Sequence, residues 1–147
     1  MRSASSWSRP SGPRLRERAL LLEAVACLGL ARAAVIVLPF RVIARGLGER
    51  MEETPASAPA TARARGVGRA LAVAAARTPW RSKCLEQALA AKAMLRRRGI
   101  RSTMYLGVTP PPVEAHAWVR VADVHVTGGT DVDRYAVVAS FADPARG

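Results

Sequence analysis

The feature that most limits what this chain can fold into is an alternating run near its C-terminal end. Residues 115–121 read AHAWVRV and residues 124–128 read VHVTG, so that small or apolar residues recur at every second position. Successive side chains of a strand point to opposite faces, and this pattern therefore predicts two half-buried strands. Only two residues, Ala122 and Asp123, separate the two strands, which predicts a tight turn and hence an antiparallel hairpin.

A helix is predicted immediately upstream, over the run CLEQALAAKAMLRRRG at residues 84–99. One apolar stripe follows from helical spacing and consists of Cys84, Ala88, Ala91 and Leu95. Lys92 and residues 96–98 flank or oppose the stripe, and Gly99 is a natural residue to end the helix. The hairpin therefore has an amphipathic helix available to cover one of its faces.

The rest of the chain divides into four segments. Residues 1–14 read as a disordered basic tail, 15–47 as a helical region with Gly29 and Pro39 as points for a bend or break, and 48–64 as a Pro/Ala/Ser-rich linker. Residues 65–147 form the core, with a short helix over 65–77, a strand over 101–108 and a last strand over 135–141. Helices, a linker, a helix and then three or four antiparallel strands predict an α+β fold.

The charge is concentrated in the N-terminal half. Residues 1–83 carry fifteen Lys/Arg against five Asp/Glu, whereas residues 84–147 carry eight against six. This excess suits an anionic partner such as an acidic peptide, nucleic acid or lipid headgroups, or is simply a solvated face. The apolar run after the tail is interrupted by Glu23 and Arg32, so packed helices are favoured over a membrane span.

The two cysteines lie in different settings, and their spacing does not indicate a disulfide framework, which fits the cytoplasm. Cys84 opens its helix directly after Lys83, and helix N-termini and nearby cations both lower the pKa of a thiol. Cys27 lies in mid-helix among apolar residues and reads as a core residue. Cys84 is therefore the candidate nucleophile, although a small buried side chain is the alternative for it as well.

His116 is the candidate base for Cys84, thirty-two residues downstream. It shares a strand face with Trp118 and Arg120, which suggests that it points into a cleft. Three aspartates in the hairpin and beyond could hold its imidazole, and of Asp123, Asp131 and Asp133 we favour Asp131. A metal site is not expected, because the histidines and cysteines lack the spacing of metal ligands.

The run PWRSKCLEQALAAKAMLRRRGIRSTMYLGV followed by AHAWVRV resembles the transglutaminase-like cysteine protease of lasso peptide biosynthesis. It is closest to the split type, in which the leader peptidase is a separate chain from the leader-recognition protein. The resemblance covers most of residues 15–143. It implies a transglutaminase-like or papain-like core, in which a cysteine-bearing helix packs on a small antiparallel sheet.

The resemblance also implies roles and partners. The cysteine and histidine of the family correspond to Cys84 and His116, while its aspartate falls at Gly128, which leaves Asp131 or a backbone carbonyl to replace it. The implied activity is removal of the leader from a ribosomally made precursor peptide, without a cofactor. The implied partners are that precursor, a leader-recognition protein and an ATP-dependent asparagine synthetase-like cyclase.

Three other functions remain open from the residues. Acyl transfer to an amine would proceed through the same thioester, and an inactive scaffold would account for Gly128. A basic nucleic-acid-binding protein is the least favoured, because the arginines at 96–98 end a helix and are not interleaved with aromatic residues.

Overall fold

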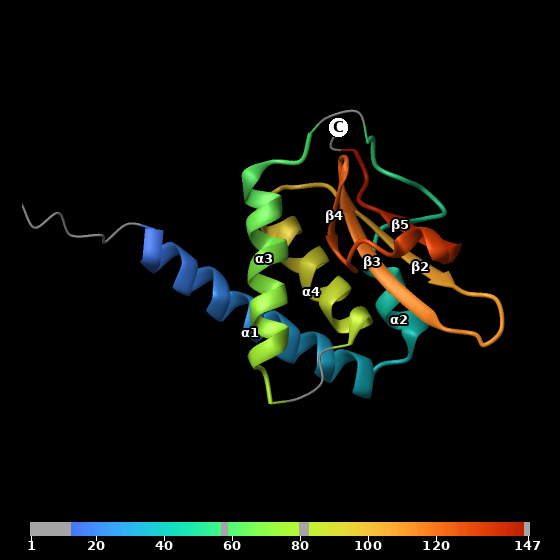
Figure 1. The fold of residues 1–147 in the computed structure, drawn as a ribbon, viewed down its shortest axis with the longest axis horizontal. Helices are drawn as coiled ribbons and strands as arrows, with labels where there is room; N and C mark the ends of the chain where they lie inside the picture. Colours follow the sequence, from blue (N-terminus) through green and yellow to red (C-terminus); the bar gives the residue numbers. More distant parts are fainter. Residues whose placement is uncertain (1–12, 57–58, 80–82, 146–147) are drawn as a thin grey trace, which may run out of the picture.

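The computed structural model describes residues 13–56, 59–79 and 83–145 of the chain. In chain order its elements are α1 (Pro13–Val37), α2 (Phe40–Arg45), β1 (Glu49–Arg50), α3 (Ala62–Arg77), α4 (Cys84–Arg97), β2 (Thr103–Val108), β3 (Ala115–Val121), β4 (Val124–Thr127), the 3-10 helix η1 (Val132–Arg134) and β5 (Ala136–Ala142). Figure 1 shows α1, α3 and α4 gathered on one side of the sheet. The predicted α+β arrangement is therefore confirmed.

The five strands form one antiparallel sheet in the order β1-β5-β2-β3-β4. The hairpin of β3 and β4 forms as predicted, and its turn places Ala122 at a φ of 48°. The sheet has one strand more than predicted, because β1 lies in the segment expected to be a linker. That segment is attached to the sheet beyond β1 as well, since the Thr54 amide donates to the Thr103 hydroxyl over 2.8 Å.

The main hydrophobic core lies between the sheet and the helices. Its members come from α1, α3, α4 and the helix-facing side of the strands, and include Leu28, Leu71, Met94, Leu95, Met104, Ala117, Val119 and Phe141. A second, smaller cluster contains Tyr105, Trp118 and Val132, with Tyr135 packed against it. Ala117 and Val119 thus face the helices and Trp118 faces away, which confirms the alternation predicted for β3.

Helix α1 runs without a break through Gly29 and ends at Val37, two residues before Pro39. It begins at Pro13, so the last two residues of the predicted disordered tail belong to the helix, and residues 1–12 lie outside the described residues. By length and composition alone, Leu15–Val37 is apolar enough to cross a membrane. One side of the helix nevertheless packs on α3 and α4, with Ala24 and Leu28 fully buried.

Helix α4 begins at Cys84, as predicted, and Ala88, Ala91 and Leu95 of its apolar stripe are buried. Lys92, which was expected to flank or oppose this stripe, is buried together with it, since only 1% of the residue is exposed. Its ammonium group donates to the carbonyl of Ser102 and pairs with Asp143, with Nζ at 2.9 Å and 3.1 Å. A buried cation becomes tolerable when carboxylate and carbonyl oxygens replace the water it has lost.

Candidate active site

Cys84 is the first residue of α4 and is half-buried against the main core. Lys83 provides the N-cap without a side-chain hydrogen bond, while its carbonyl accepts from the Gln87 amide over 3.1 Å. The predicted flanking residues Trp80, Arg81 and Ser82 lie outside the described residues. The thiol therefore lies at the N-terminal end of a helix, where the backbone amides point toward the start of the chain segment.

His116 lies near the start of β3, where it is held by a hydrogen bond and two ring contacts. Its Nε2 is 2.8 Å from the carbonyl oxygen of Gly128. Its ring stacks on Tyr135 at a centroid distance of 4.8 Å and on Trp118 at 5.8 Å. Because a carbonyl oxygen only accepts, this hydrogen bond assigns the proton to Nε2 and leaves the Nδ1 lone pair available as a base.

Gly128 can be only a glycine in this backbone. Its φ is +97°, and a Cβ built on it would lie 2.3 Å from the Cβ of Trp118. In this backbone an aspartate side chain at position 128 would collide with the tryptophan. The main chain of Gly128 supplies an acceptor for His116 in place of a carboxylate.

The structure does not bring the three candidate aspartates to His116. The Asp131 side chain is 84% exposed, and its carboxylate pairs with Arg134 at 3.5 Å. Asp123 accepts a hydrogen bond from the Ala60 amide over 2.9 Å, and Asp133 is exposed. The group that orients the imidazole here is thus the Gly128 carbonyl. Sequence reasoning did not assign Gly128 or Tyr135 to the positioning of His116. The one signal for Gly128 was the possibility that a backbone carbonyl replaces the aspartate, and no signal indicated Tyr135.

Cys84 and His116 lie at the same end of the fold but are not joined. The connection from α4 to β2 is at the opposite end, where Lys92 bonds Ser102, and His116 pairs with Gly107 near the far end of β2. However, His116 stacks with Trp118 on the sheet face turned away from the helices. Among the residues that the structure describes, no hydrogen bond connects the thiol with the imidazole.

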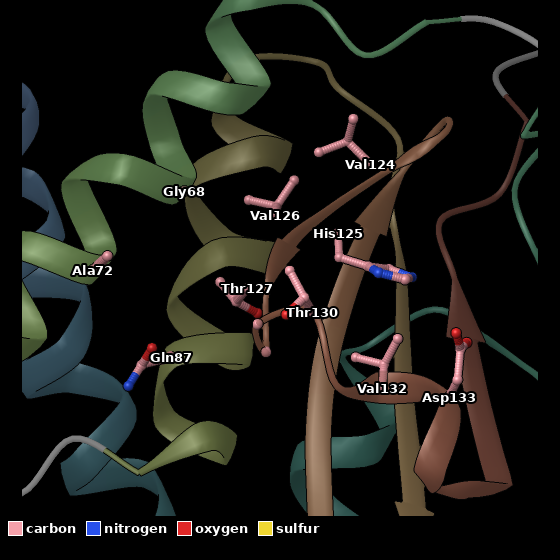
Figure 2. Close-up of a pocket in the computed structure, with 12 residues that line it drawn as sticks. Gly68, Ala72, Gln87, Val124, His125, Val126, Thr127, Thr130, Val132 and Asp133 are labelled. Carbon is pink, nitrogen blue, oxygen red and sulfur yellow. The ribbon is translucent and has the colours of Figure 1, made fainter.

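A cavity of about 650 Å³ lies between the helices and the β4–η1 segment. Its lining, drawn in Figure 2, comprises Gly68, Ala72, Gln87, Val124, His125, Val126, Thr127, Gly128, Gly129, Thr130, Val132 and Asp133. Gln87 is one turn along α4 from Cys84, and Gly128 is the residue bonded to His116. The cavity therefore extends between the element that carries the thiol and the one that orients the imidazole.

Two polar features of this region bear on ligands. The buried hydroxyl of Thr127, a lining residue, has no hydrogen-bond partner within the described part of the chain. Over the same residues, no group of three or more His, Cys, Asp or Glu side chains lies close enough to hold a metal ion. Near the cavity, Cys84 offers a thiol, His116 an imidazole and the start of α4 its backbone dipoles.

The model of the transglutaminase-like superfamily matches residues 17–140, and the chain belongs to that superfamily. The match includes both Cys84 and His116. A search of curated proteins and a search of solved structures each returned no match. The superfamily generally includes cysteine peptidases, and the fold is consistent with a cysteine protease or acyltransferase-type scaffold.

Proposed function

We propose that this protein is a cytoplasmic cysteine peptidase that removes the leader from a ribosomally synthesised precursor during lasso peptide maturation. The observation that carries the proposal is the fixed tautomer of His116, with Nε2–H held by the Gly128 carbonyl at 2.8 Å. A basic Nδ1 at the end of the fold where Cys84 opens α4 is what a thiol nucleophile requires. Membership of the transglutaminase-like superfamily supports the same chemistry.

In the proposed reaction His116 Nδ1 accepts the proton of the Cys84 thiol, and the thiolate attacks the carbonyl carbon of the scissile peptide bond. Amides at the start of α4 stabilise the oxyanion. The tetrahedral intermediate collapses to a thioester as the imidazolium protonates the departing amine. Water, deprotonated by the imidazole, then hydrolyses the thioester and restores the thiol.

The proposal includes assembly of the site by partners, because the two side chains are not joined in the isolated chain. The partners proposed are a leader-recognition protein, the precursor peptide and an ATP-dependent asparagine synthetase-like cyclase. Binding of the first two would bring the thiol within hydrogen-bond distance of the imidazole while the Gly128 carbonyl still holds Nε2–H. In this arrangement the leader-recognition protein increases the rate of the chemical step as well as the affinity for the precursor.

Iodoacetamide alkylation between pH 5 and 9 tests the thiol–imidazole pair, in the isolated chain and with the precursor and leader-recognition protein added. In the complex, one site should alkylate rapidly below pH 7, disappear in Cys84→Ala and slow at least tenfold in His116→Ala. Cys27→Ala is the matched control, because Cys27 packs against the main core and burial raises the pKa of its thiol. If Cys84 reacts like an ordinary thiol in the complex whatever residue occupies position 116, the chain is an inactive scaffold.

Acyl transfer to an amine is the second candidate, because the superfamily scaffold and the thioester are common to both reactions. Mass spectrometry of the products separates them. Hydrolysis leaves a free carboxylate on the leader, whereas aminolysis leaves an amide whose mass includes the acceptor amine. Detection of the amide alone would replace the peptidase by an acyltransferase.

A further inference from the structure

A second cavity, of about 460 Å³, lies between α2 and the strands β1 and β5. Arg50 of β1 pairs with Phe141 of β5, so their side chains lie on the same face of the sheet, which is the face that packs on the helices. The strand order places β1 and β4 at opposite edges of the sheet. This space, which we call the α2 cavity, is therefore distinct from the cavity beside β4 and from the candidate active site.

Within the described part of the chain, three arginines line the α2 cavity and no carboxylate does. Arg41 and Arg45 belong to α2 and Arg50 to β1. Glu49, the neighbour of Arg50, points to the opposite face of its strand. Three other cavities that contain arginines each include a carboxylate, from Asp143, Glu23 and Glu17 respectively. The unbalanced positive charge is thus a property of this cavity and not of every hollow on a basic protein.

The three arginines of the α2 cavity have their guanidinium groups available for a ligand. Arg41, Arg45 and Arg50 are exposed, and over the residues that the structure describes their side chains form no hydrogen bond or ion pair. By contrast, Arg96 pairs with Asp143 at 2.7 Å. Arg41 and Arg45 are four positions apart on α2, where like charges repel each other. A carboxylate bound between them would remove this repulsion and accept hydrogen bonds from both.

The rest of the α2 cavity is apolar. Phe40 meets Phe141 edge to face, with ring centroids 6.3 Å apart, and 39% of Phe40 stays exposed. Ala44 and Ala139 line the cavity beside the two rings, and their short side chains leave it open. A large apolar side chain placed here would bury apolar surface of its own and of Phe40. The cavity therefore suits an apolar side chain that has carboxylates on either side of it.

The position of β1 favours a peptide as the carrier of these groups. β1 is the end strand of the sheet and pairs with β5 alone, so its other edge has no neighbouring strand. Gly48 and Arg50 line the cavity at this strand, so an extended peptide added to the free edge of β1 passes beside the cavity. A lipid headgroup or a nucleic acid strand lacks the alternating main-chain donors and acceptors that pair with a strand edge.

We propose that the α2 cavity docks an extended acidic peptide, which places one large apolar side chain between the two phenylalanines and its flanking carboxylates on the three arginines. This site gives a use to part of the positive charge that is concentrated in the N-terminal half of the chain. The proposal does not depend on the proposed catalytic function, because Cys84 and His116 do not line the cavity. A chain that fails the alkylation test should bind the peptide all the same.

Fluorescence anisotropy of the full chain with a fluorescein-labelled EEFEE peptide tests the docking site. Saturable binding is expected in 0.05 M NaCl, and it should weaken at least threefold in 0.2 M NaCl because ions screen the charges. The peptide EEAEE, which lacks the large side chain, should bind at least fivefold more weakly, and KKFKK should not bind. No saturable binding of EEFEE up to about 1 mM overturns the proposal, as does equal affinity for EEFEE and EEAEE.

Variants locate the binding on the protein, with circular dichroism melting curves to show that each one is folded. Arg45→Gln and Arg50→Gln should each raise the Kd of EEFEE at least threefold. Arg65→Gln is the matched control, because Arg65 is an exposed arginine of α3 outside the cavity, and it should leave the Kd unchanged. Ala44→Leu fills the cavity but keeps the arginines, so it should remove the advantage of EEFEE over EEAEE.

Two results would overturn the proposal even if the chain binds an anion. Equal loss of affinity in Arg65→Gln and Arg45→Gln would show that EEFEE responds only to the net charge of the protein. Binding of an oligo-dT strand or of phosphatidylserine vesicles that Arg45→Gln abolishes, in a chain that does not bind EEFEE, would assign the cavity to phosphate groups instead of a peptide.

Discussion

Removing the carboxylate of Asp143 should destabilise the fold far more than removing the ammonium of Lys92. Asp143 also accepts from Arg96 Nε at 2.7 Å and from the Ser102 amide at 3.0 Å, and it therefore keeps partners when Lys92 is lost. Among the described residues Lys92 pairs with no second carboxylate, and only the Ser102 carbonyl would remain beside its charge. The two substitutions should therefore lower the stability of the fold by different amounts, although they break the same ion pair.

The expected magnitudes follow from burial. Asp143→Asn leaves a buried cation without its counter-charge and should lower the free energy of unfolding by about 3–5 kcal/mol. Lys92→Met fills similar space with an apolar side chain and should change it by less than about 1.5 kcal/mol. In the double variant the cost of Asp143→Asn should fall, because no uncompensated ammonium remains.

The same pair predicts a dependence on pH. Burial lowers the pKa of Lys92 from 10.5 to about 8, although the neighbouring Asp143 acts against this shift. Between pH 8 and 10.5 Lys92 is protonated in more of the unfolded chains than of the folded ones. The free energy of unfolding therefore rises by about 3 kcal/mol from this residue as the pH rises across that range. Burial acts to raise the pKa of Asp143, but Arg96 and Lys92 outweigh it and lower this pKa, so its contribution is lost as the pH falls below 4.

Urea denaturation followed by far-UV circular dichroism at pH 7, 8.5 and 10 measures both effects. The wild type should gain stability relative to Lys92→Met across this range. The reasoning is refuted if Lys92→Met costs as much as Asp143→Asn at pH 7, or if the difference between wild type and Lys92→Met does not change with pH.

Two further predictions concern glycines. In α3, Gly66→Ala should stabilise the protein by about 0.5–1 kcal/mol, because the new Cβ meets only ordinary contacts. Gly68→Ala should destabilise it by about 1–3 kcal/mol, because its Cβ would lie 2.5 Å from the Val126 carbonyl oxygen. Urea denaturation measures both changes. Equal changes in the free energy of unfolding for the two variants would contradict this contact between α3 and β4. Gly128→Ala should cost more than about 2 kcal/mol, from its left-handed φ and the collision with Trp118, and should alter the near-UV signal of that tryptophan. A cost below about 0.5 kcal/mol, typical of a neutral surface change, would show that this loop moves freely.

The buried lysine shows where sequence reasoning stops. Lys92 comes directly after Ala91, a residue of the apolar stripe of α4. A pattern based on polarity alone assigns a lysine there to the edge of the core or to solvent. Its burial depends on Asp143, fifty-one residues later, at the end of β5. Only the completed sheet brings that carboxylate to the C-terminal end of α4.

The sequence by itself determined most of the elements and their class. Alternation fixed the faces of β3, helical spacing fixed the start of α4 at Cys84, and the order of elements fixed an α+β fold, because these signals depend on neighbours within a few residues. Tertiary structure alone decided which groups meet. It gave His116 the Gly128 carbonyl in place of Asp131, kept its ring on the sheet face away from Cys84, and left one side of α1 uncovered. Such contacts depend on how strands register and how loops return, which local patterns do not specify.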